Sequence, residues 1–218
     1  MSLAMDFSRN NQGLFKKILN GVVSQLNFSI KSSIPHIRVE IGELVASLVD
    51  KCPEVQSMRG GDLQAELGFI SPEYFIKALL AIIKESVYID FQPFKVSGEQ
   101  LLGEFSISVI KADFQDLLSM KDASYKSGDN DVNWLYWLLN AGTDIVVTDY
   151  RIRYGVFARK ESHSGRAIMV PKGSYSIPAQ FAGRPNDNFI TRAIEIPGIE
   201  DMFGSIIEKN LQGILNVI

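Results

Sequence analysis

The chain has 218 residues, of which 46% are hydrophobic and 22% are charged, so it is long enough to bury a sizeable core as one large domain or two small ones. Its 22 basic and 25 acidic residues give a net charge of -3, which provides no general electrostatic attraction for nucleic acid or for an anionic membrane. A single cysteine, Cys52, excludes an intrachain disulfide and favours a reducing compartment. We expect no signal peptide, and no apolar run approaches the ~18 residues that a membrane span needs.

The N-terminal part of the chain carries helical patterns. We expect residues 1–12 to be flexible and residues 13–86 to be mainly helical. Pro35 is predicted to separate two helices, the second running over Ile37–Lys51 until Cys52-Pro53 ends it. The apolar residues of these two helices recur at helical spacing: Leu14, Ile18, Val22 and Leu26 in the first, and Ile37, Ile41, Leu44, Val45 and Leu48 in the second.

Two further helices are predicted before the first strand. A Gly-Gly turn leads into a short helix that ends near Gly68. Ser71 then stands at the N-cap position with Pro72 as the first helical residue, which predicts a helix that runs to about Ser86.

Residues 87–177 read as a sheet-rich region. Strands are predicted over 87–96 and 103–112, followed by a short helix over Asp113–Met120 and a polar loop. The stretch "NWLYWLLNAG" predicts an aromatic helix that stops at Gly142. A long strand from Asp144 to about Phe157 and its partner at 166–171 form the clearest hairpin in the chain, and we expect its polar tip, Ala158–Gly165, to project from the body.

Residues 178–218 are predicted to be helical, with one short helix after Asp187 and a C-terminal helix over Gly198–Ile218. The apolar stripe of the last helix reaches the terminus, so we expect its first half to pack on the sheet and its last turns to dock on a neighbour. The whole pattern predicts one α+β domain, residues 1–218, with a mostly antiparallel curved sheet, N-terminal helices, a short aromatic helix before a long β-hairpin and a C-terminal helix.

No convincing active site follows from the sequence. The only possible partners for Cys52 as a nucleophile are His36 and His163, and a structural thiol is the better interpretation. The Asp129-Asn130-Asp131 cluster lacks the spread of ligands and the closing Glu of a calcium loop and favours a turn with a helix cap. We therefore predict no catalytic residue, no cofactor and no metal ligand.

The long hairpin strand separates its arginines from its aromatic residues. Arg151 and Arg153 lie on one face, whereas Tyr150, Ile152 and Tyr154 lie on the other. A platform for single-stranded nucleic acid would place both kinds of residue on one exposed face. The pattern instead predicts a strand with one packed and one polar face.

Four stretches, in this order and spacing, resemble neck proteins of contractile-tailed bacteriophages, the head-completion and tail-completion proteins between portal and tail. They are "RGGDLQAELGF", "NWLYWLLNAGTDIVVTDYRI", "SGRAIMV" and "IPAQFAGRPNDNFITRAI". The resemblance covers roughly Arg59 to Ile194 and implies a non-enzymatic virion protein, assembled in the bacterial cytoplasm. It implies a homo-oligomeric ring, often a hexamer, which contacts the portal or adaptor, the tail terminator or other neck proteins. It also leaves room for DNA passing through the ring lumen without sequence-specific contact, and it implies no membrane partner.

The aromatic helix has two interpretations, as a core element or as a contact with a neighbouring copy. Trp134 and Trp137 are three residues apart and share one side of it. The candidate interface residues are Trp134, Trp137, Arg151, Arg153, His163, Arg166, Leu215 and Ile218. Alternative functions are a tail-terminator ring that caps the tail tube, a non-viral module that binds a peptide or small ligand, and a metal-independent hydrolase that uses Cys52 or a serine beside a histidine.

Overall fold

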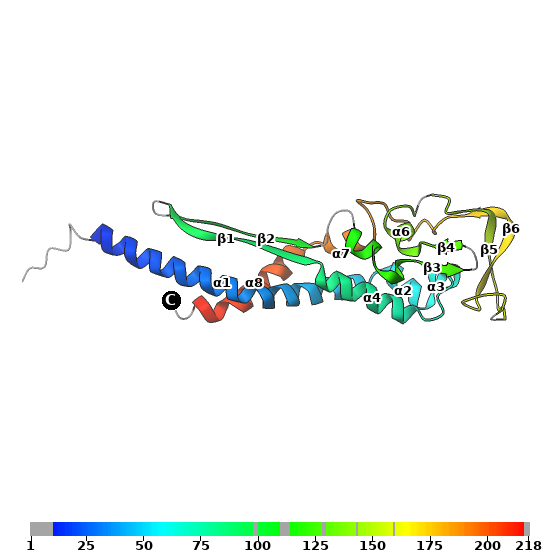
Figure 1. Ribbon diagram of the computed structural model, residues 1–218, viewed down its shortest axis with the longest axis horizontal. Helices are drawn as coiled ribbons and strands as arrows, with labels where there is room; N and C mark the ends of the chain where they lie inside the picture. Colours follow the sequence, from blue (N-terminus) through cyan, green and yellow to red (C-terminus); the bar gives the residue numbers. More distant parts are fainter. Residues whose placement is uncertain are drawn as a thin grey trace, which may run out of the picture. The chain divides into compact units, whose positions relative to one another are not determined.

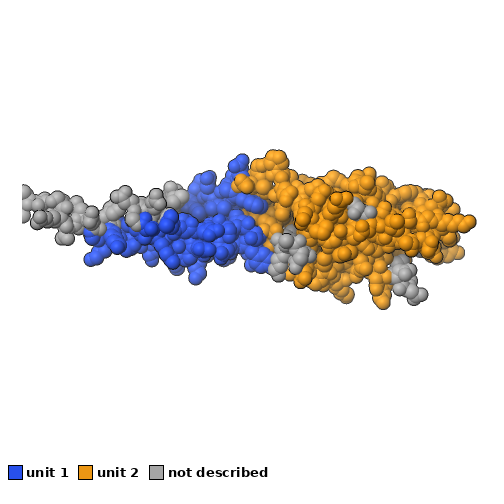
Figure 2. All heavy atoms as spheres, turned by 90° about the horizontal axis from the view of Figure 1, so that it is seen from above, with its two compact units in different colours: residues 1–40, 88–108, 201–218 blue, residues 41–87, 109–200 orange. Residues whose placement is uncertain are grey.

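The computed structural model describes residues 11–97, 100–109, 114–127, 130–142, 144–158 and 160–215. The chain divides into two compact units where the sequence predicts a single domain (Figure 2). Unit 1 contains residues 1–40, 88–108 and 201–218, and unit 2 contains residues 41–87 and 109–200. Of the expected flexible segment 1–12, residues 1–10 lie outside the described residues, and residues 11 and 12 are helical.

The described part of the chain confirms the α+β class (Figure 1). The helices are α1 (Asn11–Asp50), α2 (Pro53–Gly60), α3 (Asp62–Glu66), α4 (Pro72–Glu85), α5 (Gln115–Leu118), the 3-10 helix η1 (Lys121–Ala123), α6 (Trp134–Leu139), α7 (Phe189–Ile194) and α8 (Ile199–Leu215). The strands are β1 (Val87–Ser97), β2 (Gln100–Val109), β3 (Tyr125–Ser127), β4 (Asn130–Val132), β5 (Val147–Tyr154) and β6 (Ala167–Tyr175). They form separate two-stranded sheets, β1–β2, β3–β4 and β5–β6, rather than one curved sheet.

The prediction of two helices separated at Pro35 is wrong, because α1 runs through Pro35 without a break. A proline inside a helix removes one backbone hydrogen bond and costs about 3 kcal/mol. Burial on both sides of the proline offsets this cost, since Ile30 and Ile37 are buried, as are Ile41 and Val45 further along the helix.

Unit 1 consists of the first part of α1, the β1–β2 hairpin and α8. The side chain of Asn27 on α1 bonds to the backbone of Phe94 on β1, and Lys209 on α8 lies 3.0 Å from Glu40 on α1. Among its described residues, the buried apolar side chains are Val23, Ile30 and Ile37, all on α1. Unit 1 therefore leaves much of its apolar surface accessible.

Unit 2 holds the larger core. Its helices α2 and α3 pack together, α2 also contacts α4, and Gly42 on α1 lies so close to α4 that an added Cβ would stand 2.4 Å from the carbonyl oxygen of Lys84. Glu54 on α2 is buried and ion-paired with Arg192 on α7 at 2.6 Å. The predicted short helix after Asp187 is confirmed as α7, which Asn188 caps through a reciprocal hydrogen-bond pair with Thr191.

Two regions of unit 2, the start of α2 and the loop after α5, differ from the sequence prediction. Cys52-Pro53 does end α1, but Pro53 then begins α2, where the missing N–H of proline costs nothing. The polar loop after α5 contains η1 and the short β3–β4 hairpin. Asn130 and Asp131 lie in β4, whereas Asp129 lies outside the described residues.

Candidate interaction surface

The β5–β6 hairpin is fixed to α3 through one carboxylate. Glu66 on α3 accepts hydrogen bonds from Tyr154 at the end of β5 and from Tyr175 at the end of β6, the latter at 2.8 Å. Burial raises the pKa of Glu66, although both tyrosine hydrogen bonds oppose this shift. Burial and the nearby carboxylate raise the pKa of Tyr175 far above its ordinary value. Both ends of the hairpin are therefore held on the body of unit 2.

The tip of the hairpin also packs on the body, so the prediction of a projecting tip is wrong. Ser164 donates a hydrogen bond to the carbonyl oxygen of Ala65 at 3.1 Å, and Ser162 is buried within the tip. Arg166 bonds the carbonyl oxygen of Gly60 at 2.7 Å and the side chain of Gln64. His163 is exposed, and its Cβ lies near Gly68. Arg166 and His163 thus join the tip to the α2–α3 region of their own chain.

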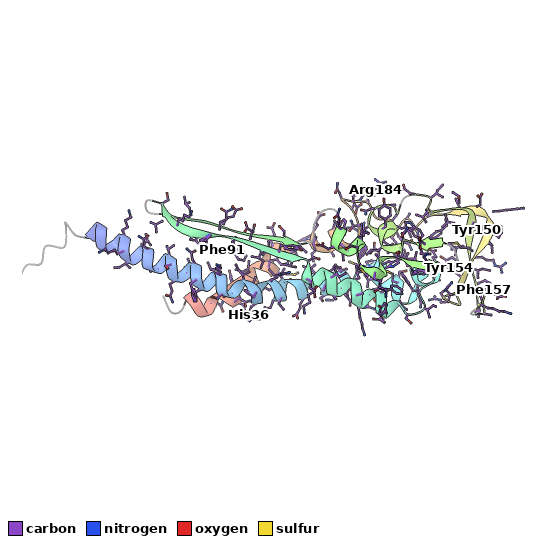
Figure 3. The ribbon with its side chains drawn as sticks, viewed as in Figure 1. His36, Phe91, Tyr150, Tyr154, Phe157 and Arg184 are labelled. Carbon is purple, nitrogen blue, oxygen red and sulfur yellow. The ribbon has the colours of Figure 1, made fainter. Side chains whose placement is uncertain are left out.

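Between these anchors the hairpin is open to solvent. Tyr150 is 45% exposed and Met169 is 44% exposed, so the predicted packed face of β5 is mostly uncovered. Arg151 and Arg153 are exposed on the opposite face, as predicted. Arg153 lies 5.4 Å from the centre of the Phe157 ring. Figure 3 labels Tyr150, Tyr154 and Phe157 along this segment.

A β-bulge bends the hairpin in this open part. Thr148 pairs with Ser174 and Tyr150 pairs with Pro171, so that Asp149 alone faces Lys172 and Gly173. Asp149 has a φ of 66° and Lys172 a φ of 72°, a backbone conformation that such residues rarely adopt. A Cβ at Gly173 would lie 2.8 Å from the Cβ of Arg151. Bulges of this kind redirect side chains and are frequent at functional sites.

We call this open part the hairpin surface and define it by its exposed residues Tyr150, Arg151, Arg153, Met169 and Lys172. Among the residues that the structure describes, Arg151 and Arg153 make no ion pair. The surface therefore combines uncovered apolar groups with cations that lack a local counter-charge.

The aromatic helix α6 is mainly a core element. Trp134 has 0% exposure, contacts Phe69 and Phe75 edge-on, and donates its indole N–H to the carbonyl oxygen of Asp122 at 2.8 Å. The prediction that Trp134 contacts a neighbour is therefore wrong, while Trp137 is partly accessible. The helix ends at Leu139 with Asn140 as its C-cap, before the predicted stop at Gly142. Gly142 instead allows close packing, because an added Cβ would stand 2.5 Å from the backbone nitrogen of Gly183.

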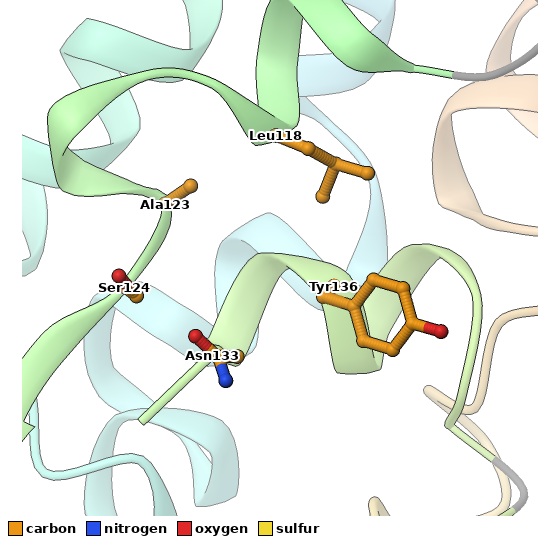
Figure 4. A pocket seen from close by; sticks show the side chains of 5 residues that line it. All are labelled: Leu118, Ala123, Ser124, Asn133 and Tyr136. Atoms are coloured by element: carbon orange, nitrogen blue, oxygen red, sulfur yellow. The ribbon is translucent and has the colours of Figure 1, made fainter. Parts of the chain in front are cut away.

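A pocket of about 270 Å³ opens beside α6 (Figure 4). Its lining residues are Leu118, Ala123, Ser124, Asn133 and Tyr136. Tyr136 is 49% exposed, and two acidic residues, Asp122 and Asp131, are sequence neighbours of the lining. These two carboxylates make no ion pair with any described residue. We call this region the pocket face.

Sequence reasoning missed Met169, Lys172, Tyr136, Asp122 and Asp131 as surface residues of interest. A count of charge by segment points to the two regions of the chain that contain them. Residues 147–175 contain six basic and two acidic residues, a net charge of +4. Residues 113–144 contain six acidic and two basic residues, a net charge of -4. The small net charge of the whole chain does not reveal these two oppositely charged segments.

Cys52 occupies a structural position. Its thiol donates to the carbonyl oxygens of Phe189 at 3.4 Å and Leu48 at 3.6 Å. Burial raises its pKa to about 11, with a further contribution from the charge of Glu54. A thiol with a raised pKa is a poor nucleophile near neutral pH.

The remaining interface candidates are Leu215 and Ile218. Leu215 is the last residue of α8, and its side chain and Ile218 lie outside the described residues. Within the described ranges no cluster of three or more His, Cys, Asp or Glu side chains is arranged to hold a metal ion. The described helices include none with both the length and the apolar character to cross a bilayer. Comparisons with protein-family models, with curated proteins and with solved structures found no match to this chain.

Proposed function

We propose that the chain is a structural virion protein of a tailed phage, forming a ring in the neck that joins the head or portal to the tail. The observation that carries this proposal is the hairpin surface, because its exposed Tyr150 and Met169 and its unpaired arginines have the composition of a protein interface. A subunit of a ring buries two different surfaces against its two neighbours.

Unit 1 supports the same proposal. On α8 the apolar residues Phe203, Ile206, Ile207 and Leu211 are only partly buried, although they share one side of the helix. Large accessible apolar surfaces are typical of proteins that associate. Contacts with further chains would cover this surface.

The proposed protein has no catalytic role, cofactor or metal. Its partners are its own copies, in a hexamer as the resemblance implies, and the portal or adaptor, the tail terminator or other neck proteins on either side. DNA passes through the lumen without sequence-specific contact, and no membrane is involved. The finer alternative, a terminator ring that caps the tail tube, differs only in the layer that the ring occupies.

Light scattering and negative-stain electron microscopy of the purified protein test the proposal. We expect closed rings of several copies, and we expect mass spectrometry to detect the chain in purified virions. A strictly monomeric protein that is absent from virions would contradict the proposal.

One observation favours a second function, the binding of a peptide or small ligand. The pocket beside Tyr136 is open and lined by both apolar and polar side chains. A monomer in which Tyr136→Ala abolishes binding of a peptide from a random library would support this function instead of the ring.

A further inference from the structure

We infer that one face of the β5–β6 hairpin binds the phosphate backbone of double-stranded DNA. We call it the arginine face and define it by Arg151, Arg153, Phe157 and Arg166. The choice of DNA rests on the proposed function, because a neck ring encloses the duplex that passes through its lumen. The contact itself is assigned from the geometry of the hairpin.

The strand register puts the three arginines on one face. Residues that pair directly across an antiparallel ladder point to the same side, and the side alternates along each strand. The pairs that occupy the arginine face are Arg151 with Val170, Arg153 with Ile168, and Gly155 with Arg166. None of these six residues is acidic. The exposed Tyr150 and Met169 lie on the opposite face, where they remain available to a neighbouring subunit.

Two glycines give the arginine side chains room on this face. An added Cβ at Gly173 would stand 2.8 Å from the Cβ of Arg151 and 3.4 Å from its Cδ, so the stem of Arg151 lies across this glycine. An added Cβ at Gly155 would come within 3.0 Å of the Phe157 ring, and the guanidinium carbon of Arg153 lies 5.4 Å from the centre of that ring. Both arginines are therefore held against the hairpin, which reduces the entropy that they lose on binding.

The three arginines also keep their charges. Within the described part of the chain, Arg151 and Arg153 form no ion pair. Arg166 bonds two uncharged acceptors, the carbonyl oxygen of Gly60 at 2.7 Å and the side chain of Gln64 at 2.9 Å. Both bonds use Nη1, which leaves Nη2 and Nε of Arg166 for a further partner. The arginine face therefore presents three positive charges that no described carboxylate neutralises.

The carboxylates of α3 act on the tyrosines of the hairpin. Glu66 accepts hydrogen bonds from Tyr154 and Tyr175. Burial raises the pKa of Tyr154, and the carboxylates of Glu66 and Asp62 raise it further. No described hydrogen bond joins either carboxylate to an arginine of the hairpin. The acidic groups near the hairpin thus leave the arginine face available to an anion.

Arginines at alternate positions of one strand suit a repeating anion such as the DNA backbone. Two residues of an extended strand span about 7 Å, so Arg151 and Arg153 present two guanidinium groups in a row. Guanidinium groups bind phosphate oxygens through paired hydrogen bonds. A duplex fits better than a single strand, because Phe157 is only partly exposed and supports Arg153, whereas single-strand sites use open rings to stack bases.

An acidic protein is the other class of partner that could meet this face. Protein interfaces combine arginines with an apolar anchor at their centre. The exposed apolar residues of the hairpin, Tyr150 and Met169, lie on the opposite face and cannot provide that anchor beside the arginines. DNA is therefore the better partner, and binding of a protein is an outcome of the test.

Fluorescence anisotropy of a labelled duplex of about 20 base pairs, added to the full-length protein, tests the inference. We expect the affinity to fall as salt rises from about 50 to 200 mM and to be equal for two unrelated sequences. R151A/R153A leaves one of the three phosphate contacts in each subunit, so the slope of log affinity against log salt should fall to about one third of the wild-type value. R151K/R153K keeps the charges and should keep that slope. K51A/K77A removes two other exposed cations of unit 2 and is the matched control, with an unchanged slope.

A second measurement uses the wild type alone and covers the case in which R151A/R153A does not fold. Hydrogen exchange is followed with and without the duplex. We expect slower exchange over residues 150–157 and 166–173 when the duplex is present, and no change in α4. Equal exchange in the hairpin with and without the duplex would overturn the inference.

The outcomes separate the inference from the proposed function. Wild-type rings that do not bind the duplex, or an R151A/R153A variant with the wild-type slope, would overturn the arginine face as a DNA contact and leave the ring intact. A monomeric wild type whose duplex binding depends on Arg151 and Arg153 would contradict the ring and support the DNA contact. Loss of self-association in R151A/R153A, with no duplex binding by the wild type, would assign the face to a protein partner and overturn the inference.

Discussion

The side-chain amide of Asn27 pairs with both backbone polar groups of Phe94. Its Nδ2 donates to the carbonyl oxygen at 2.9 Å, and its Oδ1 accepts from the amide N–H at 2.8 Å. The amide thus satisfies the outer edge of β1 as a neighbouring strand would, and it fastens the β1–β2 hairpin to α1.

We expect Asn27→Ala to weaken unit 1. The substitution leaves one donor and one acceptor of Phe94 without their partners, a loss of about 1–3 kcal/mol. Hydrogen exchange at the Phe94 amide should accelerate about 10- to 100-fold. Asn20→Ala, at an exposed position of the same helix, is the control and should leave that rate unchanged. Equal exchange rates in N27A and the wild type would contradict a structural role for the pair.

Cys52 should react slowly with thiol reagents in the native protein. With a pKa of about 11, only about 0.1% of the thiol is ionised at pH 8, and the thiolate is the reactive form. The alkylation rate should therefore rise about tenfold per pH unit up to about pH 10. Fast alkylation at pH 7 would show an activated thiol and would revive the hydrolase hypothesis.

The raised pKa of Cys52 also determines in which direction the stability of the protein changes with pH. Between the ordinary thiol pKa and about 11, the unfolded chain loses the Cys52 proton while the folded chain keeps it, so this group lowers stability as pH rises. Cys52→Ser should remove this alkaline loss and cost roughly 1 kcal/mol at neutral pH. Urea titrations of both proteins at pH 7 and pH 10 measure the difference.

Arg192 should matter for stability because its partner Glu54 is 3% exposed. Arg192→Ala leaves a buried carboxylate without its cation, and we expect a loss of about 2–4 kcal/mol, reduced from the fully buried case because Arg192 itself is partly exposed. Lys84→Ala breaks the exposed pair with Glu43 and serves as the control, with a loss of about 0–1 kcal/mol. Equal losses in the two variants would show that burial of Glu54 adds nothing.

Local signals in the sequence predict several of these elements well. Ser71-Pro72 marks the start of α4, and alternating residues mark β2 and β5, because caps and side-chain periodicity depend on near neighbours. The uninterrupted α1 is not predictable in this way, since the burial that stabilises it across Pro35 comes from distant segments. The docking of the hairpin tip on Ala65 and Gly60 is likewise not predictable from local signals, because it joins residues that are far apart in the sequence.

The exposure of some surface residues was likewise predictable from the sequence, and that of others was not. The polar face of β5 follows from alternation, so Arg151 and Arg153 were predictable as exposed. The exposure of Tyr150 was not, because no element of the described structure covers that face of the hairpin. Trp134 and Tyr136 are two residues apart on α6, and only the packing of Phe69 and Phe75 decides which of them is buried.

Glu66 should make unit 2 sensitive to pH. Its pKa is raised above the ordinary value, mainly by burial, so the folded chain binds a proton at a pH where the unfolded chain has lost it. Across this window stability therefore falls as pH rises, and it is recovered as pH falls toward the ordinary glutamate pKa. Glu66→Gln carries no titrating proton and can still accept a hydrogen bond from one of the tyrosines, so its stability should change less over the same window. Thermal unfolding of both proteins between about pH 4 and pH 7 gives the comparison.

Tyr154→Phe provides a second test of the Glu66 carboxylate. It removes a hydrogen bond that favours the charged carboxylate, so it should raise the pKa of Glu66 further and steepen the pH dependence of stability. Parallel stability curves for the wild type, E66Q and Y154F would mean that the carboxylate beneath the hairpin does not titrate in this range.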